Sequence, residues 1–313
     1  MASKTLPTDG TMSTWGFFER FPNEDAARAY METQRWDGTP RCPHCDSVRI
    51  SRPKNEKPQP FRCKDCRKFF SVKTGTVFHS ANLSLQKCLY AIYLMAVAKK
   101  SISSCQMARE LGIAQKSAWY LEQRIRETWN QNDADQMPFI GEVEIDEAYF
   151  GGLEKNKHAN KKQRNGRGPA GKQPVVGLKE RATGRIKAMP VDEVDKLTLH
   201  TIIEARVEPD STIYTDGHKG YTGLRDYKHR TVDHSVGEYV NDMVHVNGVE
   251  SFWALLKRAY IGTFHHFSVK HLRRYVDEFA TRQSRRDFTT MEHIAAAIKN
   301  AEGKLGYAKL TAS

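Results

Sequence analysis

The sequence predicts a multidomain α+β protein, and three stretches of the 313-residue chain carry this prediction. Two Cys-x-x-Cys pairs, at 42–45 and 63–66, are typical of a small module held together by a metal ion. Between residues 84 and 129, apolar side chains recur at helical spacing and a glycine interrupts them. From residue 142 onward, segments that alternate polar and apolar residues indicate strands, and helical patterns lie between and after them.

The composition favours a folded protein with a polyanionic partner. Hydrophobic residues make up 39% of the chain, which is enough for real cores. The formal charge of +12 favours nucleic acid, because clustered Lys and Arg release counterions from it. The N-terminus lacks a signal pattern, and the most apolar run, 88–98, is too short to cross a bilayer. We therefore expect a cytoplasmic protein without a membrane partner.

The N-terminal part is expected to hold a zinc module. Residues 1–35 are interpreted as a helical docking segment, in which Asn23 caps a helix that ends near Thr33. Residues 36–80 are interpreted as a zinc ribbon whose last strand follows the alternation over 69–78. One structural Zn²⁺ is expected, because four thiolates close its coordination sphere. The predicted ligands are Cys42, Cys45, Cys63 and Cys66.

Residues 81–130 show the pattern of a helix-turn-helix domain. Ser103 is a predicted helix cap, Gly112 breaks the short helix, and a longer helix follows to about Trp129. The second helix of such a motif can enter the DNA major groove. Any three-helix packing unit would show similar core spacing, so that alternative stays open. The predicted DNA-binding side chains are Gln115, Lys116, Ser117, Tyr120 and Arg124.

After a linker at 131–138, residues 139–286 are expected to form a catalytic α/β domain, and 287–313 a C-terminal helix and tail. The predicted order is a strand at 142–146, strands at 174–178 and 184–191, a helix at 195–207 and a strand at 211–216. The insert at 153–172 is basic and rich in glycine, so we expect a loop that contacts DNA, with a merely disordered loop as the alternative. Its predicted DNA-binding residues are Lys161, Lys162, Arg164 and Arg167.

Three acidic residues stand at element boundaries of this domain. Asp146 and Asp216 are each expected at the carboxyl end of a strand. Asn247 and Glu250 match a capping box at the start of a helix, and Lys257 follows Glu250 by about two helical turns. Three carboxylates that converge from such positions would suit Mg²⁺ and phosphoryl transfer. Glu144, on the same strand face as Asp146, is an alternative ligand.

The acidic residues lie in the motifs EIDEAYFGG, IYTDGHKGY and HVNGVESFWALLKR. These motifs resemble the Asp-Asp-Glu triad and trailing basic residue of DDE transposases, and the chain is most similar to the zinc-ribbon insertion-sequence transposases of the ISXO-like group. The resemblance spans about 15–286 and implies an RNase H-like core. It assigns Asp146, Asp216 and Glu250 to two Mg²⁺ (or Mn²⁺) ions per active site. Some members use Asn in the third role, so Asn247 is a further candidate.

The resemblance implies a transposase that binds terminal inverted repeats and then cleaves and joins DNA. Double-stranded DNA would be the partner at the element ends and at the target, with Lys257 and Arg258 against phosphate. A homodimer or higher oligomer on DNA, associated with a prokaryotic nucleoid, is expected by analogy. Two alternatives stay open. One is a DNA-binding regulator with an inactive core, and the other is an RNase H-like nuclease that hydrolyses without joining.

Overall fold

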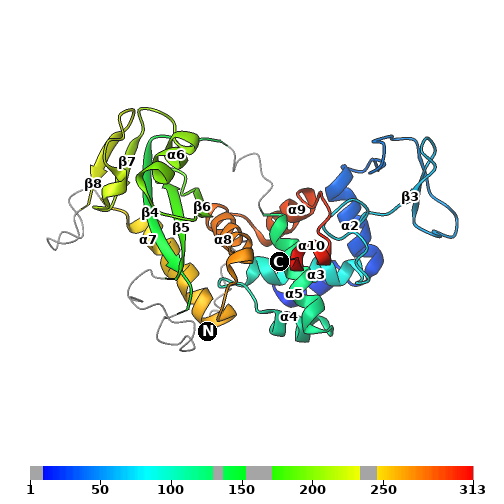
Figure 1. Cartoon of the computed structure of the whole chain (residues 1–313). Helices are drawn as coiled ribbons and strands as arrows, with labels where there is room; N and C mark the ends of the chain where they lie inside the picture. The colour runs from blue at the N-terminus through cyan, green and yellow to red at the C-terminus, as the bar shows by residue number, and fades with distance from the viewer. Residues whose placement is uncertain (1–9, 130–136, 153–170, 233–244, 313) are drawn as a thin grey trace, which may run out of the picture. The chain divides into compact units, whose positions relative to one another are not determined.

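The computed structural model describes residues 10–129, 137–152, 171–232 and 245–312, and within these it divides the chain into two compact units (Figure 1). Unit 1 comprises Met1–Gln131 together with Asp287–Ser313, and unit 2 comprises Asn132–Arg286. The predicted basic residues of the insert, at 161, 162, 164 and 167, lie outside the described residues. None of the described helices is long and apolar enough to cross a membrane.

Unit 1 is built on a helical core. Its first helices are α1 (Thr14–Arg20), α2 (Glu24–Trp36) and α3 (Leu85–Val97). Asn23 caps α2 by accepting the Ala26 N–H, as the sequence predicted, and Ser84 caps α3 in the same way. Nearly every side chain of α3 is buried, because other elements pack around it. This helix is therefore the centre of unit 1.

The C-terminal segment returns to this helical core. Helix α9 (Thr290–Lys299) packs against α2 and α3, and its Ile294 and Ile298 belong to the same buried cluster as Leu89. The Val77 N–H donates to the Ala301 carbonyl at 2.7 Å, which ties the chain after the ribbon to the chain after α9. The two ends of unit 1 thus share one core.

The zinc ribbon is a three-stranded antiparallel sheet of β1 (Ile50–Ser51), β2 (Phe61–Cys63) and β3 (Phe69–Phe70). Phe61 and Phe70 stack with ring centroids 5.3 Å apart. The predicted last strand over 69–78 is wrong beyond Phe70, because the chain then turns. Val72, Val77 and Phe78 are buried in the helical core, which explains their apolar pattern without a strand.

Two helices joined by a short turn follow α3. They are α4 (Ser104–Leu111) and α5 (Gln115–Glu127). Ser103 caps α4 as predicted, and Gly112 ends it in the left-handed region at φ 60°, which glycine adopts without strain. Ala118, Leu121 and Ile125 bury one face of α5. The geometry is that of a helix–turn–helix unit within unit 1.

Unit 2 contains a five-stranded mixed sheet in the order β6-β5-β4-β7-β8. The strands are β4 (Glu142–Phe150), β5 (Gln173–Glu180), β6 (Ile186–Pro190), β7 (Thr212–Thr215) and β8 (Lys228–Thr231). Strand β5 pairs antiparallel with β4 and β6, whereas β7 pairs parallel with β4 and β8. The first strand runs four residues beyond Asp146, so the prediction that Asp146 ends it is corrected.

Helices cover both faces of this sheet. Helix α6 (Lys196–Arg206) packs Leu199 and Ile203 against Val143 and Ile145 of β4. Helices α7 (Asn247–Ala259) and α8 (Val269–Ser284) cover the opposite face. Gly177 of β5 permits this second contact, because a Cβ there would approach the Trp253 ring to 2.6 Å. The successive side chains of β4 therefore point into two separate cores.

Candidate metal and nucleic-acid sites

Asp146 and Asp216 lie side by side on neighbouring parallel strands. The β4–β7 register pairs Val143 with Ile213 and Glu144 with Tyr214. Two residues further along each chain, this register brings Asp146 opposite Asp216, just after β7 ends at Thr215. The end of β7 opens the sheet at this point while β4 continues. The pair that the sequence predicted is therefore brought together by strand pairing.

A third carboxylate joins this pair, and it is Glu147. One oxygen each of Asp146, Glu147 and Asp216 lies within 4.8 Å of the others, and each of these residues is half-buried. The Tyr221 hydroxyl donates to Glu147, and Tyr221 is itself fully buried. Sequence reasoning passed over Glu147, because strict alternation along β4 places it on the face opposite Asp146.

The clustered carboxylates are held in an environment that opposes their ionisation. Burial raises the pKa of Asp146 to about 7, with further repulsion from Glu147, Asp216 and Glu250. Burial likewise raises the pKa of Glu147 to about 7, although the Tyr221 hydrogen bond acts in the opposite direction. A bound cation would remove this cost, because it neutralises the charges that burial penalises. The donor set fits a hard divalent ion such as Mg²⁺ or Mn²⁺.

Glu250 lies on α7 outside the close group of three. Its side chain is exposed, and its charge reaches far enough to contribute to the raised pKa of Asp146. Asn247, Lys257 and Arg258 are also exposed on α7. The helix thus presents a carboxylate in its first turn and two cations in its last turn. The predicted convergence of Glu250 with both aspartates is looser than that of Glu147.

The start of α7 corrects the predicted capping box. Asn247 is the first helical residue, the N-cap is Val246, and neither supplies a side-chain cap. Instead the Val249 N–H donates to the Glu144 carboxylate at 2.9 Å. Glu144 is buried and also pairs with Arg181 at 2.9 Å. A carboxylate from β4 therefore caps the helix, so Glu144 is interpreted as a clamp and not as a ligand.

The four predicted zinc ligands do come together. The Sγ atoms lie 3.6 Å apart in the Cys42–Cys66 pair and 3.7 Å apart in the Cys45–Cys63 pair. A tetrahedral site with Zn–S of about 2.3 Å separates its sulfurs by about 3.8 Å, so the spacing fits Zn²⁺. Burial acts to raise the pKa of Cys63, but the backbone N–H groups of Cys66 and Asp65 outweigh it and lower this pKa to about 6.

The predicted DNA-facing residues of α5 divide into two groups. Gln115, Lys116 and Ser117 are exposed at its start, where the Gln115 amide donates to the Ser104 hydroxyl. Tyr120 and Arg124 take part in internal packing.

The contacts of Tyr120 and Arg124 stay within unit 1. The Tyr120 hydroxyl donates to the Leu305 carbonyl at 2.5 Å, and its ring packs edge-on against Tyr307 of the C-terminal helix α10 (Tyr307–Thr311). Arg124 is 7% exposed and donates to the His79 carbonyl and to the Tyr120 hydroxyl. This placement corrects the expectation that both side chains are available to DNA.

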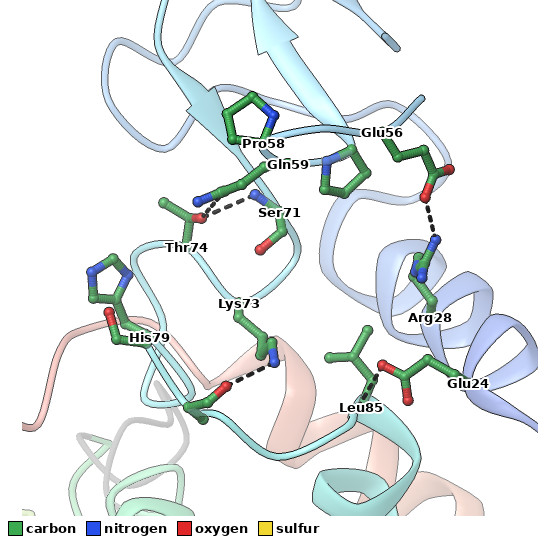
Figure 2. Close-up of a pocket in the computed structure, with 13 residues that line it drawn as sticks. Glu24, Arg28, Glu56, Pro58, Gln59, Ser71, Lys73, Thr74, His79 and Leu85 are labelled. Atoms are coloured by element: carbon green, nitrogen blue, oxygen red, sulfur yellow. Dashed lines mark hydrogen bonds and ion pairs between the residues drawn. The ribbon is translucent and has the colours of Figure 1, made fainter. Parts of the chain in front are cut away.

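A cavity of about 360 Å³ lies elsewhere in unit 1, between the ribbon and the helices (Figure 2). Glu24 accepts the Leu85 N–H, which supports the start of α3, and Arg28 pairs with Glu56 at 2.8 Å. The Lys73 ammonium donates to the Ala81 and Leu83 carbonyls. These bonds connect the ribbon to the helical core, so we interpret the cavity as a structural joint.

Profiles of two protein families match the chain. The ISXO2-like transposase domain matches residues 138–283, and the transposase zinc-ribbon domain matches residues 22–69. An uncharacterized protein in transposable element ISH50 of Halobacterium salinarum is 30% identical over 250 residues, which cover 76% of this chain and 83% of that protein. An uncharacterized transposase-like protein of Haemophilus influenzae is 29% identical over 96 residues, which cover 30% of this chain and 76% of that protein.

Among solved structures, a simian T-cell lymphotropic virus intasome in complex with the PP2A regulatory subunit B56 gamma matches with a TM-score of 0.26 and 15% identity, over 54% of this chain and 62% of that chain. This score is too low to support a structural argument. The two family profiles, in contrast, fall on the regions that carry the cysteine and carboxylate groups, in the predicted order. The chain therefore belongs to the ISXO2-like family of zinc-ribbon insertion-sequence transposases.

Proposed function

We propose that this protein binds the terminal inverted repeats of an insertion sequence and catalyses metal-dependent DNA cleavage and strand transfer. The observation that carries the proposal is the pairing of Asp146 with Asp216 at the point where β7 ends, inside the matched transposase domain. Two buried carboxylates at an open sheet edge are suited to a cation and to a phosphodiester. The membership of the family supports this chemistry over a purely structural acidic pair.

The chain's own residues would divide the work between metal and DNA. Asp146 and Asp216 present the oxygens that would hold the ions, with Glu147 beside them and Glu250 on α7. Two Mg²⁺ or Mn²⁺ ions, when bound, would activate a water or a terminal 3′-hydroxyl and stabilise the leaving 3′-oxygen. Lys257 lies on the same helix as Glu250 and would contact phosphate. Water as nucleophile gives cleavage, and a DNA 3′-hydroxyl gives joining.

DNA recognition is proposed for unit 1 and for the basic insert of unit 2. The exposed start of α5 offers Gln115, Lys116 and Ser117 for contact with DNA. The insert residues at 161, 162, 164 and 167 and the cations Lys257 and Arg258 would neutralise backbone phosphates. Joining two element ends requires more than one catalytic unit, so a homodimer or larger assembly on DNA is part of the proposal.

A joining assay with labelled candidate ends, a target plasmid and Mn²⁺ tests this function. We expect joined product from the parent and from Glu193→Gln, which removes an exposed charge of unit 2. Asp216→Ala should lower joining by about 100-fold or more, because losing a metal ligand removes several kcal/mol of transition-state stabilisation. Glu250→Gln should also lower it.

The assay separates the alternatives by product. DNA binding without any cleavage, unchanged by Asp216→Ala, would support a regulator with an inactive core. Metal-dependent release of hydrolysed ends that are never joined to the plasmid would support a nuclease. Either result would reject strand transfer as the function.

A further inference from the structure

We infer that Glu147, in place of the helix-borne Glu250, is the third inner carboxylate of the metal centre, and that Tyr221 is the positioning residue that holds it there. The inference rests on the proposed function and refines it. It assigns a ligand that neither the spacing of the motifs nor the alternation along β4 indicates.

The distances favour Glu147. Its carboxylate, with those of Asp146 and Asp216, offers three oxygens within 4.8 Å of one another. Mg–O bonds of about 2.1 Å place two opposite ligands of one ion about 4.2 Å apart. The three oxygens therefore need only a small contraction to share an ion. In the part of the chain that the structure describes, Glu250 is not a member of this close group.

The end of β7 explains how Glu147 reaches the site from the other face of β4. Beyond Thr215 the register brings Gly217 beside Glu147, and no strand residue stands in the way. The 3₁₀ turn Lys219–Tyr221 then packs against α6, because a Cβ on Gly220 would approach the Leu199 side chain to 2.7 Å. This turn is thereby fixed beneath the sheet edge.

Tyr221 supplies the orientation. Its ring is fully buried in the core that α6 shares with β4, and its hydroxyl donates to one carboxylate oxygen of Glu147. A phenol is protonated at neutral pH, so the donor is always present. A hydrogen bond to one oxygen leaves the second oxygen available for an ion. Buried donors of this kind typically orient a metal ligand, and their loss weakens metal binding.

Glu250 then takes a different place in the site. It is exposed on the first turn of α7, and it acts on Asp146 through its charge. Removing its charge should therefore affect DNA joining more than it affects the affinity for a metal ion in the absence of DNA. This difference separates the two glutamates experimentally.

Titration of Mn²⁺ into the zinc-loaded full-length protein, followed by calorimetry without DNA, tests the inference. We expect Glu147→Gln to weaken Mn²⁺ binding by at least about tenfold, and Tyr221→Phe by about tenfold, the usual effect of losing an orienting partner. Glu147→Asp should recover part of the loss, because it restores the charge. Glu250→Gln and the exposed control Glu193→Gln should change the affinity by less than about threefold.

Melting of the metal-free variants checks that each of them folds. Parent-like Mn²⁺ affinity in a folded Glu147→Gln protein would overturn the inference. Parent-like affinity in Tyr221→Phe would overturn the role of the tyrosine. Asp146→Asn distinguishes the two levels of the account. If Asp146→Asn abolishes binding and Glu147→Gln does not, only this inference fails, whereas if Asp146→Asn also binds as the parent does, the proposed metal centre fails with it.

Discussion

At the scale of single residues, the buried carboxylates make stability depend on pH. Burial raises the pKa of Asp146 to about 7, from 3.8 in the unfolded chain. The folded state therefore holds a proton that the unfolded state has already lost. Its stability is complete below about pH 4 and decreases as the pH rises through 7. Above that pH the ionised carboxylate is held at a cost until a cation neutralises it.

This argument predicts that Asp146→Asn stabilises the metal-free protein. At pH 8 the variant should melt at a higher temperature than the parent, and the difference should be smaller at pH 5, where Asp146 is protonated in the folded state. Adding Mn²⁺ should raise the melting temperature of the parent more than that of the variant. Asp192→Asn, at an exposed position of unit 2, is the matched control.

Scanning calorimetry in the absence of divalent cations gives the measurement. A variant that melts below the parent at pH 8 would show that the ionised Asp146 contributes favourably to the fold, contrary to this account.

The residues of the two sites differ in how far the sequence could predict them. The cysteines were predictable, because each knuckle is local and four thiolates fill a zinc site. Asp146 and Asp216 were predictable as a pair from strand patterns and motifs. Glu147 was not, because alternation gives only its face, and its position depends on where a neighbouring strand ends. Nor could a sequence pattern show that Tyr221 donates to it.

At the scale of elements, helix α7 depends on a residue that is remote in sequence. Glu144 of β4 accepts the Val249 N–H and pairs with Arg181, whose guanidinium also lies 3.8 Å from the centroid of the Tyr214 ring. A Cβ on Gly248 would approach the Glu144 carboxylate to 2.6 Å, so glycine permits this contact. The clamp connects the helix that carries Glu250 to the strand that carries Asp146.

The clamp predicts a large effect of Glu144→Ala. Its removal leaves Arg181 without the carboxylate that it contacts at 2.9 Å, and both side chains are largely buried. We expect a loss of about 3 kcal/mol in the free energy of unfolding, as for other broken buried pairs. Urea denaturation, with the exposed Glu193→Ala as control, measures it. A loss equal to that of the control would show that α7 does not need the clamp.

Local patterns predicted the helices and strands better than their ends. The helices that start after Asn23, Ser84 and Ser103 begin where a side-chain cap satisfies a backbone N–H. The predicted cap of α7 failed because a buried carboxylate from another element took its place. The predicted ribbon strand over 69–78 failed because burial in a helical core can imitate strand alternation over a few residues.

At the scale of the whole molecule, the zinc site and the carboxylate group belong to different compact units. Removing zinc should therefore unfold the ribbon and leave the sheet of unit 2 intact. The ribbon's own buried core is small, and its cluster includes Phe61, Phe70 and two of the ligand cysteines. A structural metal commonly supplies the folding energy that such a core lacks.

Hydrogen exchange before and after chelation tests this independence. We expect faster exchange in residues 42–70 and unchanged exchange in β4 and β5. Readdition of Zn²⁺ should restore the protection, which serves as the control for irreversible damage. Equal loss of protection in the sheet of unit 2 would show that the two units unfold together, against the division described above.

The path of the chain at this scale was only partly predictable. The order of ribbon, helical unit and catalytic domain follows from motifs spread along the sequence. The return of α9 to the core of unit 1 does not, because an amphipathic helix indicates that it is covered without indicating by which element. The Val77–Ala301 hydrogen bond, between residues far apart in the chain, has no local signal.

The central claim is that Asp146 and Asp216 together form a divalent-metal site for DNA transfer. Anomalous diffraction from a crystal of the protein grown with Mn²⁺ tests it most directly. The account predicts a manganese peak within coordinating distance of both carboxylates, and no such peak in Asp146→Asn. A well-ordered Asp146–Asp216 pair with manganese bound only elsewhere would contradict it.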